Sequence, residues 1–257
     1  GKSVEDARCG GTSGCVETGA FGKEAYILTG YFNLVKVLEI TLHNGVDPRT
    51  GKKIGMETGD PAEFKTYEDL FEAFKKQMHH FIDIKIRGNN VIEKLYADQM
   101  PCPFLSIIID DCIKRGKDYN AGGARYNTRY IQGVGIGTLT DSLSSIKKHV
   151  FDDRRLTMKE MLEVLDNNFE GREDIRQLFL NRTPRYGNDD DYADEIMKEA
   201  FDAYYNEVNG RPTVCGGTHR IDMLPTTCHV YFGEVTGATS DGRKAGMPQS
   251  EGISPVQ

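Results

Sequence analysis

The sequence has no long apolar run, no dense basic run and no apolar leader at its start. Its longest apolar stretch, residues 105–109, is followed at once by Asp110 and Asp111 and is far shorter than the ~20 residues that span a bilayer. Its 32 basic residues are scattered among 39 acidic ones, for a net charge of −7. Because phosphate binding needs a concentrated basic surface, this pattern argues against nucleic acid as the main partner. We therefore expect a cytoplasmic protein without a membrane or nucleic-acid partner.

The sequence also lacks a Cys-x-x-Cys pair, although it contains six cysteines. This absence argues against zinc ribbons and thioredoxin-type sites, and it predicts neither a bound metal nor a cofactor held by these residues. The chain is much longer than a small disulfide-dense scaffold, so we expect reduced thiols.

Hydrophobic periodicity and capping residues predict an α/β chain with long helices between few strands. The expected helices cover 31–44, 66–100, 105–116, 141–150, a segment opened by the capping box at 157–160, and 189–208. The expected strands cover 126–134 and 224–232. Glycines 133, 135 and 137 resemble part of a dinucleotide fingerprint, but the full spacing is missing, so we interpret them as sites of close backbone packing. No linker or composition shift marks a domain boundary.

The chemistry is concentrated near the N-terminus, where glycines surround Cys15 and Glu17. In extended backbone, residues two apart point to the same side, so these two side chains would face one cavity. A carboxylate beside a thiol disfavours the thiolate that hydrolytic cysteines need, whereas a neutral thiol suits hydrogen-atom transfer. By residue types alone, a chance Cys-x-Glu triplet with a purely structural role remains open.

Four spaced segments, in this order, resemble the glycyl radical enzymes, the family related to pyruvate formate-lyase. They are Glu5–Arg8, Gly14–Glu17, the glycines at 133–135 with Asp141–Leu143, and Ala238–Gly246 with Gly252–Pro255. The resemblance covers nearly the whole chain. It implies that residues 1–257 form part, about one half, of a ten-stranded α/β barrel. The active-site cysteine loop would lie near residues 8–22, and the segment near 233–257 would lead to a glycyl radical domain.

The same resemblance implies the roles of individual residues. Cys15 would carry the thiyl radical that takes a hydrogen atom from the substrate, and Glu17 would manage the proton of the substrate hydroxyl. Tyr31, which follows the loop closely, is a candidate substrate contact, with core packing as the alternative. The radical would be stored on a glycine outside this chain, installed by an iron–sulfur activating enzyme that uses S-adenosylmethionine. The complete protein is expected to be a homodimer.

The radical-site motif of the family, Arg-Val-x-Gly-aromatic, has no counterpart in this chain. The nearest string, residues 234–238, lacks both the arginine and the aromatic residue. We therefore expect an internal piece of a longer enzyme that does not turn over by itself. The runs at 15–31 and 223–230 most resemble the members that dehydrate trans-4-hydroxy-L-proline.

Several alternatives remain beside this dehydratase. Within the family these are glycerol and propanediol dehydratases, a choline lyase, and a formate acetyltransferase-like enzyme, which the single cysteine disfavours. Outside it, the chain could be a non-catalytic binding protein derived from the barrel, or a thiol hydrolase.

Overall fold

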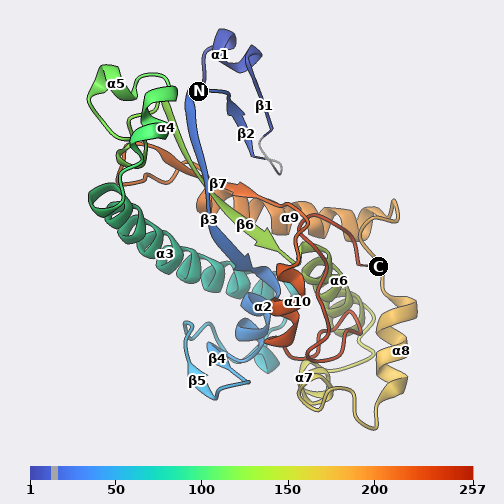
Figure 1. Cartoon of the computed structure of the whole chain (residues 1–257). Helices are drawn as coiled ribbons and strands as arrows, with labels where there is room; N and C mark the ends of the chain where they lie inside the picture. The colour runs from blue at the N-terminus through green and yellow to red at the C-terminus, as the bar shows by residue number, and fades with distance from the viewer. Residues whose placement is uncertain (13–16, 257) are drawn as a thin grey trace. The chain divides into compact units, whose positions relative to one another are not determined.

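The structure is a computed structural model that describes residues 1–12 and 17–256 (Figure 1). Its described strands are β1 (Gly10–Thr12), β2 (Thr18–Ala20), β3 (Glu24–Asn33), β4 (Val46–Asp47), β5 (Lys52–Lys53), β6 (Tyr126–Val134) and β7 (Thr218–Asp222). Its described α-helices are α1 (Val4–Arg8), α2 (Leu34–Leu42), α3 (Tyr67–Gln99), α4 (Pro103–Ile108), α5 (Cys112–Arg115), α6 (Ile136–Ile146), α7 (Met158–Asp166), α8 (Glu173–Arg182), α9 (Asp191–Val208) and α10 (Cys228–Glu234). Short 3₁₀ turns lie at Pro61–Glu63 and Tyr119–Ala121, and a π-helical turn at Lys147–Asp152.

The chain forms two compact units, each built from three separate stretches of sequence. Unit 1 consists of Gly1–Tyr31, Ile82–Gln132 and Tyr205–Leu224. Unit 2 consists of Phe32–Phe81, Gly133–Tyr204 and Pro225–Gln257. Because the stretches of the two units alternate along the chain, a search for linkers in the sequence cannot find this division.

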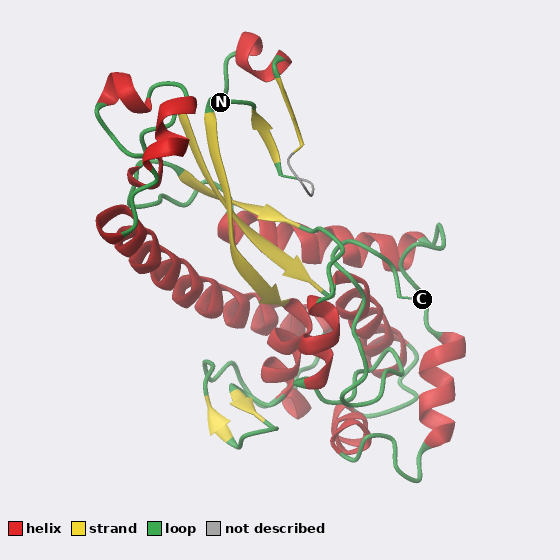
Figure 2. Cartoon of the chain, in the orientation of Figure 1, coloured by secondary structure: helices red, strands yellow, loops and turns green. Residues whose placement is uncertain are grey.

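Unit 1 is organised around a sheet with the strand order β3-β6-β7 (Figure 2). Strands β6 and β7 are parallel, and their register places Tyr130 opposite Arg220 and Gln132 opposite Asp222. Since side chains alternate along a strand, Tyr130 and Gln132 share one face of β6, and Arg129 lies on the other. Strand β6 has the bounds expected from the sequence, which confirms that prediction.

Unit 2 is built mainly from helices around an apolar core. Helix α2 packs against α6, and the largest fully buried side chains of the unit come from several of its elements: Leu34, Leu38, Leu70, Phe74, Met78, Ile136, Leu139, Leu143, Phe179 and Tyr204. Gly135 adopts a φ of 90° as the N-cap of α6. A Cβ at Gly137 would overlap the Ser254 carbonyl oxygen. Close backbone packing therefore explains these two glycines, as expected.

Local capping signals fix the helix starts that the sequence predicted. Thr66 and Asp69 cap α3 reciprocally: the Asp69 N–H donates to Thr66 Oγ1 at 3.1 Å and the Thr66 N–H to Asp69 Oδ2 at 3.0 Å. The capping box between Thr157 and Glu160 is present at the start of α7. Each device satisfies backbone donors that the first helical turn leaves unpaired.

Four predictions about the secondary structure need correction. The helix expected at 31–44 covers only Leu34–Leu42, because residues 31–33 belong to β3. The strand expected at 224–232 is wrong, because β7 lies earlier and α10 occupies Cys228–Glu234. Pro225, which has no N–H to donate to a sheet ladder, lies between them. Helix α6 begins at Ile136 rather than 141. The stripe at 105–116 is split into α4 and α5 around Asp111, whose φ is 76°.

The α/β character expected from the sequence is confirmed. Across the described ranges, no helix combines the length and apolarity needed to cross a membrane. Among the described cysteines, Cys9, Cys102, Cys112, Cys215 and Cys228 are free thiols.

Candidate active site

The structure locates two of the three candidate residues. Cys15 lies outside the described residues, so its position relative to Glu17 stays a prediction. Glu17 immediately precedes β2 and is buried, with 6% of its surface exposed. Tyr31 lies near the end of β3 and is 39% exposed, which leaves its ring accessible to a ligand. Its contact with a substrate also stays a prediction.

The segment around the candidate loop is an antiparallel hairpin of β1 and β2. Gly10 pairs with Ala20 and Gly11 with Gly19. A Cβ at Gly10 would overlap the Gly19 carbonyl oxygen, and a Cβ at Gly19 would overlap the ring of Tyr26. The density of glycine therefore reflects close approach between the strands and the ring rather than a flexible linker.

Two buried carboxylates hold this hairpin in place. Glu24, on β3, accepts hydrogen bonds from the Ala20 N–H at 2.9 Å and from Thr128 Oγ1 at 2.7 Å. Asp6 pairs with Lys23 at 2.6 Å and with Arg125 at 3.2 Å. The hydrogen bonds from Lys23 and Tyr126 hold the pKa of Asp6 well below its usual range. Asp6 belongs to the Glu5–Arg8 motif, so at least part of that motif serves to anchor the loop.

The hairpin is joined to β6 on the face that carries Tyr130 and Gln132. The Tyr130 hydroxyl donates to the Thr18 carbonyl at 3.1 Å, one residue after Glu17. Gln132 Nε2 donates to the Leu224 carbonyl at 2.7 Å. These two contacts connect β6 both to the residue beside Glu17 and to the segment that leaves β7.

A second buried carboxyl, that of Asp222, lies near enough to Glu17 to feel its charge. Asp222 is 7% exposed. Burial and the nearby charge of Glu17 raise the pKa of Asp222. Sequence reasoning missed Asp222 because β7 was not predicted. The polar residue at the end of Thr218–Asp222 was the available signal, since strand ends often carry functional side chains.

On the opposite face of β6, Arg129 forms a buried ion pair with Glu93 of α3. The two groups are 2.7 Å apart, with side-chain exposures of 3% and 7%. This pair anchors the face of β6 that carries Arg129, while Tyr130 and Gln132 anchor the opposite face. Neighbouring residues of β6 therefore make different contacts: Arg129 forms a structural ion pair, and Tyr130 binds the residue next to Glu17.

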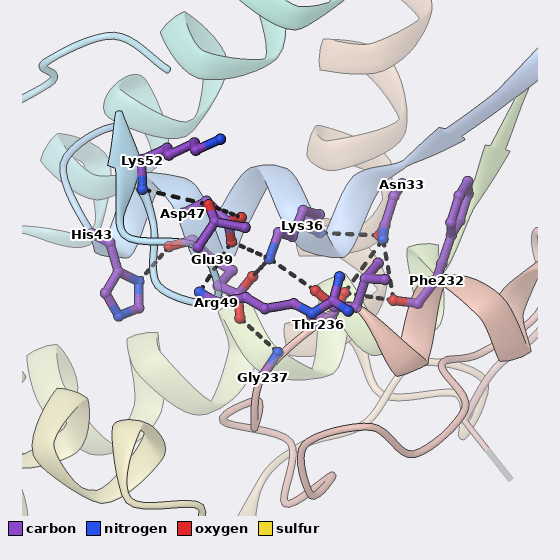
Figure 3. A network of polar contacts seen from close by, with 12 residues as sticks. Asn33, Lys36, Glu39, His43, Asp47, Arg49, Lys52, Phe232, Thr236 and Gly237 are labelled. Atoms are coloured by element: carbon purple, nitrogen blue, oxygen red, sulfur yellow. Dashed lines mark hydrogen bonds and ion pairs between the residues drawn. The ribbon is translucent and has the colours of Figure 1, made fainter. Parts of the chain in front are cut away.

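In unit 2, a polar network anchors the segment after α10 (Figure 3). Lys36 of α2 contacts Glu39 and donates to Asp47 Oδ1 at 2.7 Å and to the Val235 carbonyl at 2.9 Å. The Gly237 N–H donates to Glu39 Oε1 at 2.6 Å. Backbone groups of residues 234–238 therefore bind side chains of α2 and hold this segment against the helix.

The Ala238–Gly246 motif is stabilised by hydrogen bonds within it and by contacts with α6 and with the residues after α8. Asp241 Oδ1 accepts from Thr239 Oγ1 at 2.6 Å and from the Arg243 N–H at 3.1 Å. Arg185 donates both to the Asp241 carbonyl at 2.8 Å and to Asp141 Oδ2 at 3.2 Å. Burial raises the pKa of Asp141 to about 7. Within this part of the motif, the described contacts are structural.

None of the described residues form a group of three or more His, Cys, Asp or Glu side chains suited to hold a metal ion. The groups that the described residues offer for chemistry here are the two buried carboxyls, Glu17 and Asp222.

Comparisons with known proteins identify similar chains. The family model described as pyruvate formate lyase-like matches residues 1–233. Trans-4-hydroxy-L-proline dehydratase of Clostridioides difficile is 68% identical over 255 residues, which cover 99% of this chain and 32% of that protein.

Solved structures agree with this result. The crystal structure of hydroxyproline dehydratase from Clostridioides difficile with its substrate trans-4-hydroxy-L-proline bound matches with a TM-score of 0.98 and 68% identity, covering 99% of this chain and 32% of that one. A glycyl radical enzyme from Archaeoglobus fulgidus matches with a TM-score of 0.92 and 37% identity, covering 99% and 32%. The chain therefore spans about a third of the length of the relatives it matches.

Proposed function

Since the chain belongs to the pyruvate formate lyase-like family, we propose that it carries the hydrogen-abstracting cysteine of a glycyl radical dehydratase acting on trans-4-hydroxy-L-proline. The observation that carries this proposal is the 68% identity to a dehydratase of that substrate over 99% of the chain. The α/β fold expected from the resemblance is confirmed by the structural match to hydroxyproline dehydratase.

In this proposal, residues 8–22 form the active-site loop and residues 233–257 lead toward the radical domain. Cys15 is the hydrogen-abstracting residue, Glu17 the acid/base and Tyr31 a substrate contact. The radical is stored on a glycine outside this chain and is installed by an activating enzyme that uses an iron–sulfur cluster and S-adenosylmethionine. Gly237 does not suit this role, because its N–H is bound to Glu39 and the Arg-Val-x-Gly-aromatic motif is missing around it.

The reaction balances as follows. The Cys15 sulfur takes a hydrogen atom from a substrate carbon beside the one that bears the hydroxyl. The C–O bond then breaks, and the leaving hydroxyl takes a proton from Glu17 and departs as water. The substrate radical returns a proton to the carboxyl, and the product radical takes a hydrogen atom back from the Cys15 thiol. The net change is the loss of one water, and a positioned carboxyl contributes about 10²–10⁴-fold to such a step.

The test uses the complete enzyme that contains this chain, activated without oxygen. Cys15→Ser should abolish consumption of trans-4-hydroxy-L-proline while the glycyl radical stays visible by electron paramagnetic resonance, because a serine hydroxyl is much harder to convert to a radical than a thiol. Cys9→Ser is the matched control, since Cys9 is an exposed free thiol and its loss should leave turnover intact. Substantial product from Cys15→Ser would refute the assignment.

A second variant tests the carboxyl. Glu17→Gln keeps the size and hydrogen bonding of the side chain but cannot exchange a proton, so it should lose turnover and keep the radical. Near-normal turnover would make Glu17 a structural residue. Glycerol, propane-1,2-diol and choline are assayed in parallel. An unmutated, activated enzyme that consumes none of the four compounds would contradict the proposed dehydratase.

A further inference from the structure

Strand β3 is irregular one residue before Tyr31, the candidate substrate contact. Gly30 has a φ of 125°, a conformation that glycine adopts readily and other residues adopt only with strain. In a regular strand, Tyr31 would share the face that carries Thr29, because side chains alternate. The backbone at Gly30 breaks this alternation, so the direction of the Tyr31 side chain depends on how Gly30 is held.

The ammonium group of Lys85, on α3, lies against this glycine. Lys85 Nζ donates a hydrogen bond to the Thr29 carbonyl at 3.0 Å. A Cβ at Gly30 would overlap the same nitrogen. The missing side chain at Gly30 therefore makes room for the ammonium group, which holds the backbone on the N-terminal side of Tyr31.

Asn89, one turn further along α3, holds the same residue of β3 by its side chain. Asn89 is 5% exposed, and its Nδ2 donates to Thr29 Oγ1 at 2.9 Å, which in turn donates to the Tyr130 carbonyl at 2.9 Å. Residues four apart lie on one face of a helix, so Lys85 and Asn89 bind the carbonyl and the hydroxyl of Thr29 together. Tyr130 also binds the Thr18 carbonyl of the candidate loop. These contacts connect α3, two strands and the loop.

A lysine is a costly residue at this place. The Lys85 side chain is half-buried, and burial lowers its pKa. Among the residues that the structure describes, no carboxylate acts against this effect of burial. A buried ammonium group without a counter-charge is unfavourable, whereas its hydrogen bond to a carbonyl is stronger than one between neutral groups. The arrangement therefore favours a firm hold on the Thr29 carbonyl over stability.

We propose that Lys85 is a positioning residue that directs the Tyr31 hydroxyl toward the substrate, through the Thr29 carbonyl and the backbone of Gly30. This inference rests on the proposed function, in which Tyr31 contacts trans-4-hydroxy-L-proline. Tyr31 is 39% exposed, so core packing restrains its ring less than that of a buried tyrosine. A hydrogen bond weakens steeply when its donor is misaligned, and the contact with Lys85 fixes the backbone from which that donor extends.

The experiment measures KM and kcat for trans-4-hydroxy-L-proline with the complete, activated enzyme and its Lys85→Met variant. Methionine keeps an unbranched apolar stem and removes the ammonium group. KM should rise about 3- to 10-fold, the range expected for the loss of one hydrogen bond, while kcat should change by less than about 2-fold. Lys94→Met is the matched control, because Lys94 lies on the same helix and is 63% exposed. It should leave both constants unchanged.

A double-mutant cycle separates this role from a general structural one. In a Tyr31→Phe background, Lys85→Met should raise KM by less than about 1.5-fold, because the hydroxyl that Lys85 positions is already absent. Gly30→Ala strains the backbone and displaces the ammonium group, so it should raise KM in the same way. The glycyl radical signal reports whether each variant folds and is activated. If Lys85→Met gives no radical, Lys85→Gln takes its place, because it also removes the charge and keeps a polar group.

The outcomes distinguish this inference from the proposed function. An active enzyme in which Lys85→Met leaves KM unchanged, lowers kcat alone, or raises KM equally with and without the Tyr31 hydroxyl overturns the inference and leaves the dehydratase standing. The same conclusion follows if Lys85→Gln also lacks the radical, since Lys85 is then a structural residue. Unchanged kinetics of Tyr31→Phe remove the substrate contact and this inference with it. An unmutated enzyme that carries the radical but consumes no trans-4-hydroxy-L-proline overturns the proposed function itself.

Discussion

The buried ion pair between Arg129 and Glu93 gives a sharp prediction about stability. The groups lie 2.7 Å apart and are almost fully removed from water. Glu93 also accepts a hydrogen bond from the Val214 N–H at 3.0 Å. Arg129→Met would leave the Glu93 carboxylate buried with one backbone donor. Removing one partner of a buried pair costs about 3–5 kcal/mol, and we expect the free energy of unfolding to fall by that amount.

A second substitution tests the cause of the loss. Glu93→Gln added to Arg129→Met removes the stranded charge and keeps an acceptor for Val214. The double variant should therefore be more stable than Arg129→Met alone, although it has one more substitution. Few other mechanisms predict this sign.

The assay is urea denaturation followed by circular dichroism at 25 °C, with the midpoint and slope fitted together. The control is Lys94→Gln on the same helix, where Lys94 and Asp98 are 2.6 Å apart but 63% and 45% exposed. That loss should stay below about 1 kcal/mol. A cost of less than about 1 kcal/mol for Arg129→Met, or a double variant no more stable than the single one, would refute the reasoning.

Three further predictions follow from single sites. Burial raises the pKa of Asp141 to about 7, above its value in the unfolded chain. The contribution of Asp141 to stability is therefore full near pH 4 and is lost as the pH rises through about 7. Asp141→Asn should make the measured free energy of unfolding depend less on pH across that range. Gly233→Ala would overlap the Met247 carbonyl and should lower the free energy of unfolding by about 1–3 kcal/mol. Gly88→Ala, in open space on α3, should raise it slightly. Tyr31→Phe in the complete, activated enzyme should raise KM several-fold with little change in kcat, because the hydroxyl contacts substrate in the proposal. Unchanged kinetics would contradict this contact.

The sequence by itself determined the local structure and the family. The caps at Thr66 and Thr157 and the bounds of β6 depend on residues that are close together in the sequence, so the sequence predicts them. The order of spaced motifs predicts the cysteine loop, and two of its glycines mark close approach, Gly10 to backbone and Gly19 to the Tyr26 ring. The strand predicted at 224–232, where β-branched and aromatic residues favour one, is wrong: Pro225 cannot donate to a sheet ladder, and α10 occupies Cys228–Glu234.

Only the tertiary structure decided which distant residues meet. Asp222 comes near Glu17, about two hundred positions away in the sequence, because β7 pairs with β6 and Tyr130 of β6 binds the Thr18 carbonyl. Arg129 and Glu93 pair because a strand and a helix pack together. Neither arrangement leaves a periodic signal in the sequence, since strand pairing and burial depend on the whole fold rather than on neighbouring residues. A local motif therefore predicts Cys15 and Glu17 as site residues, whereas only the fold brings Asp222 near Glu17.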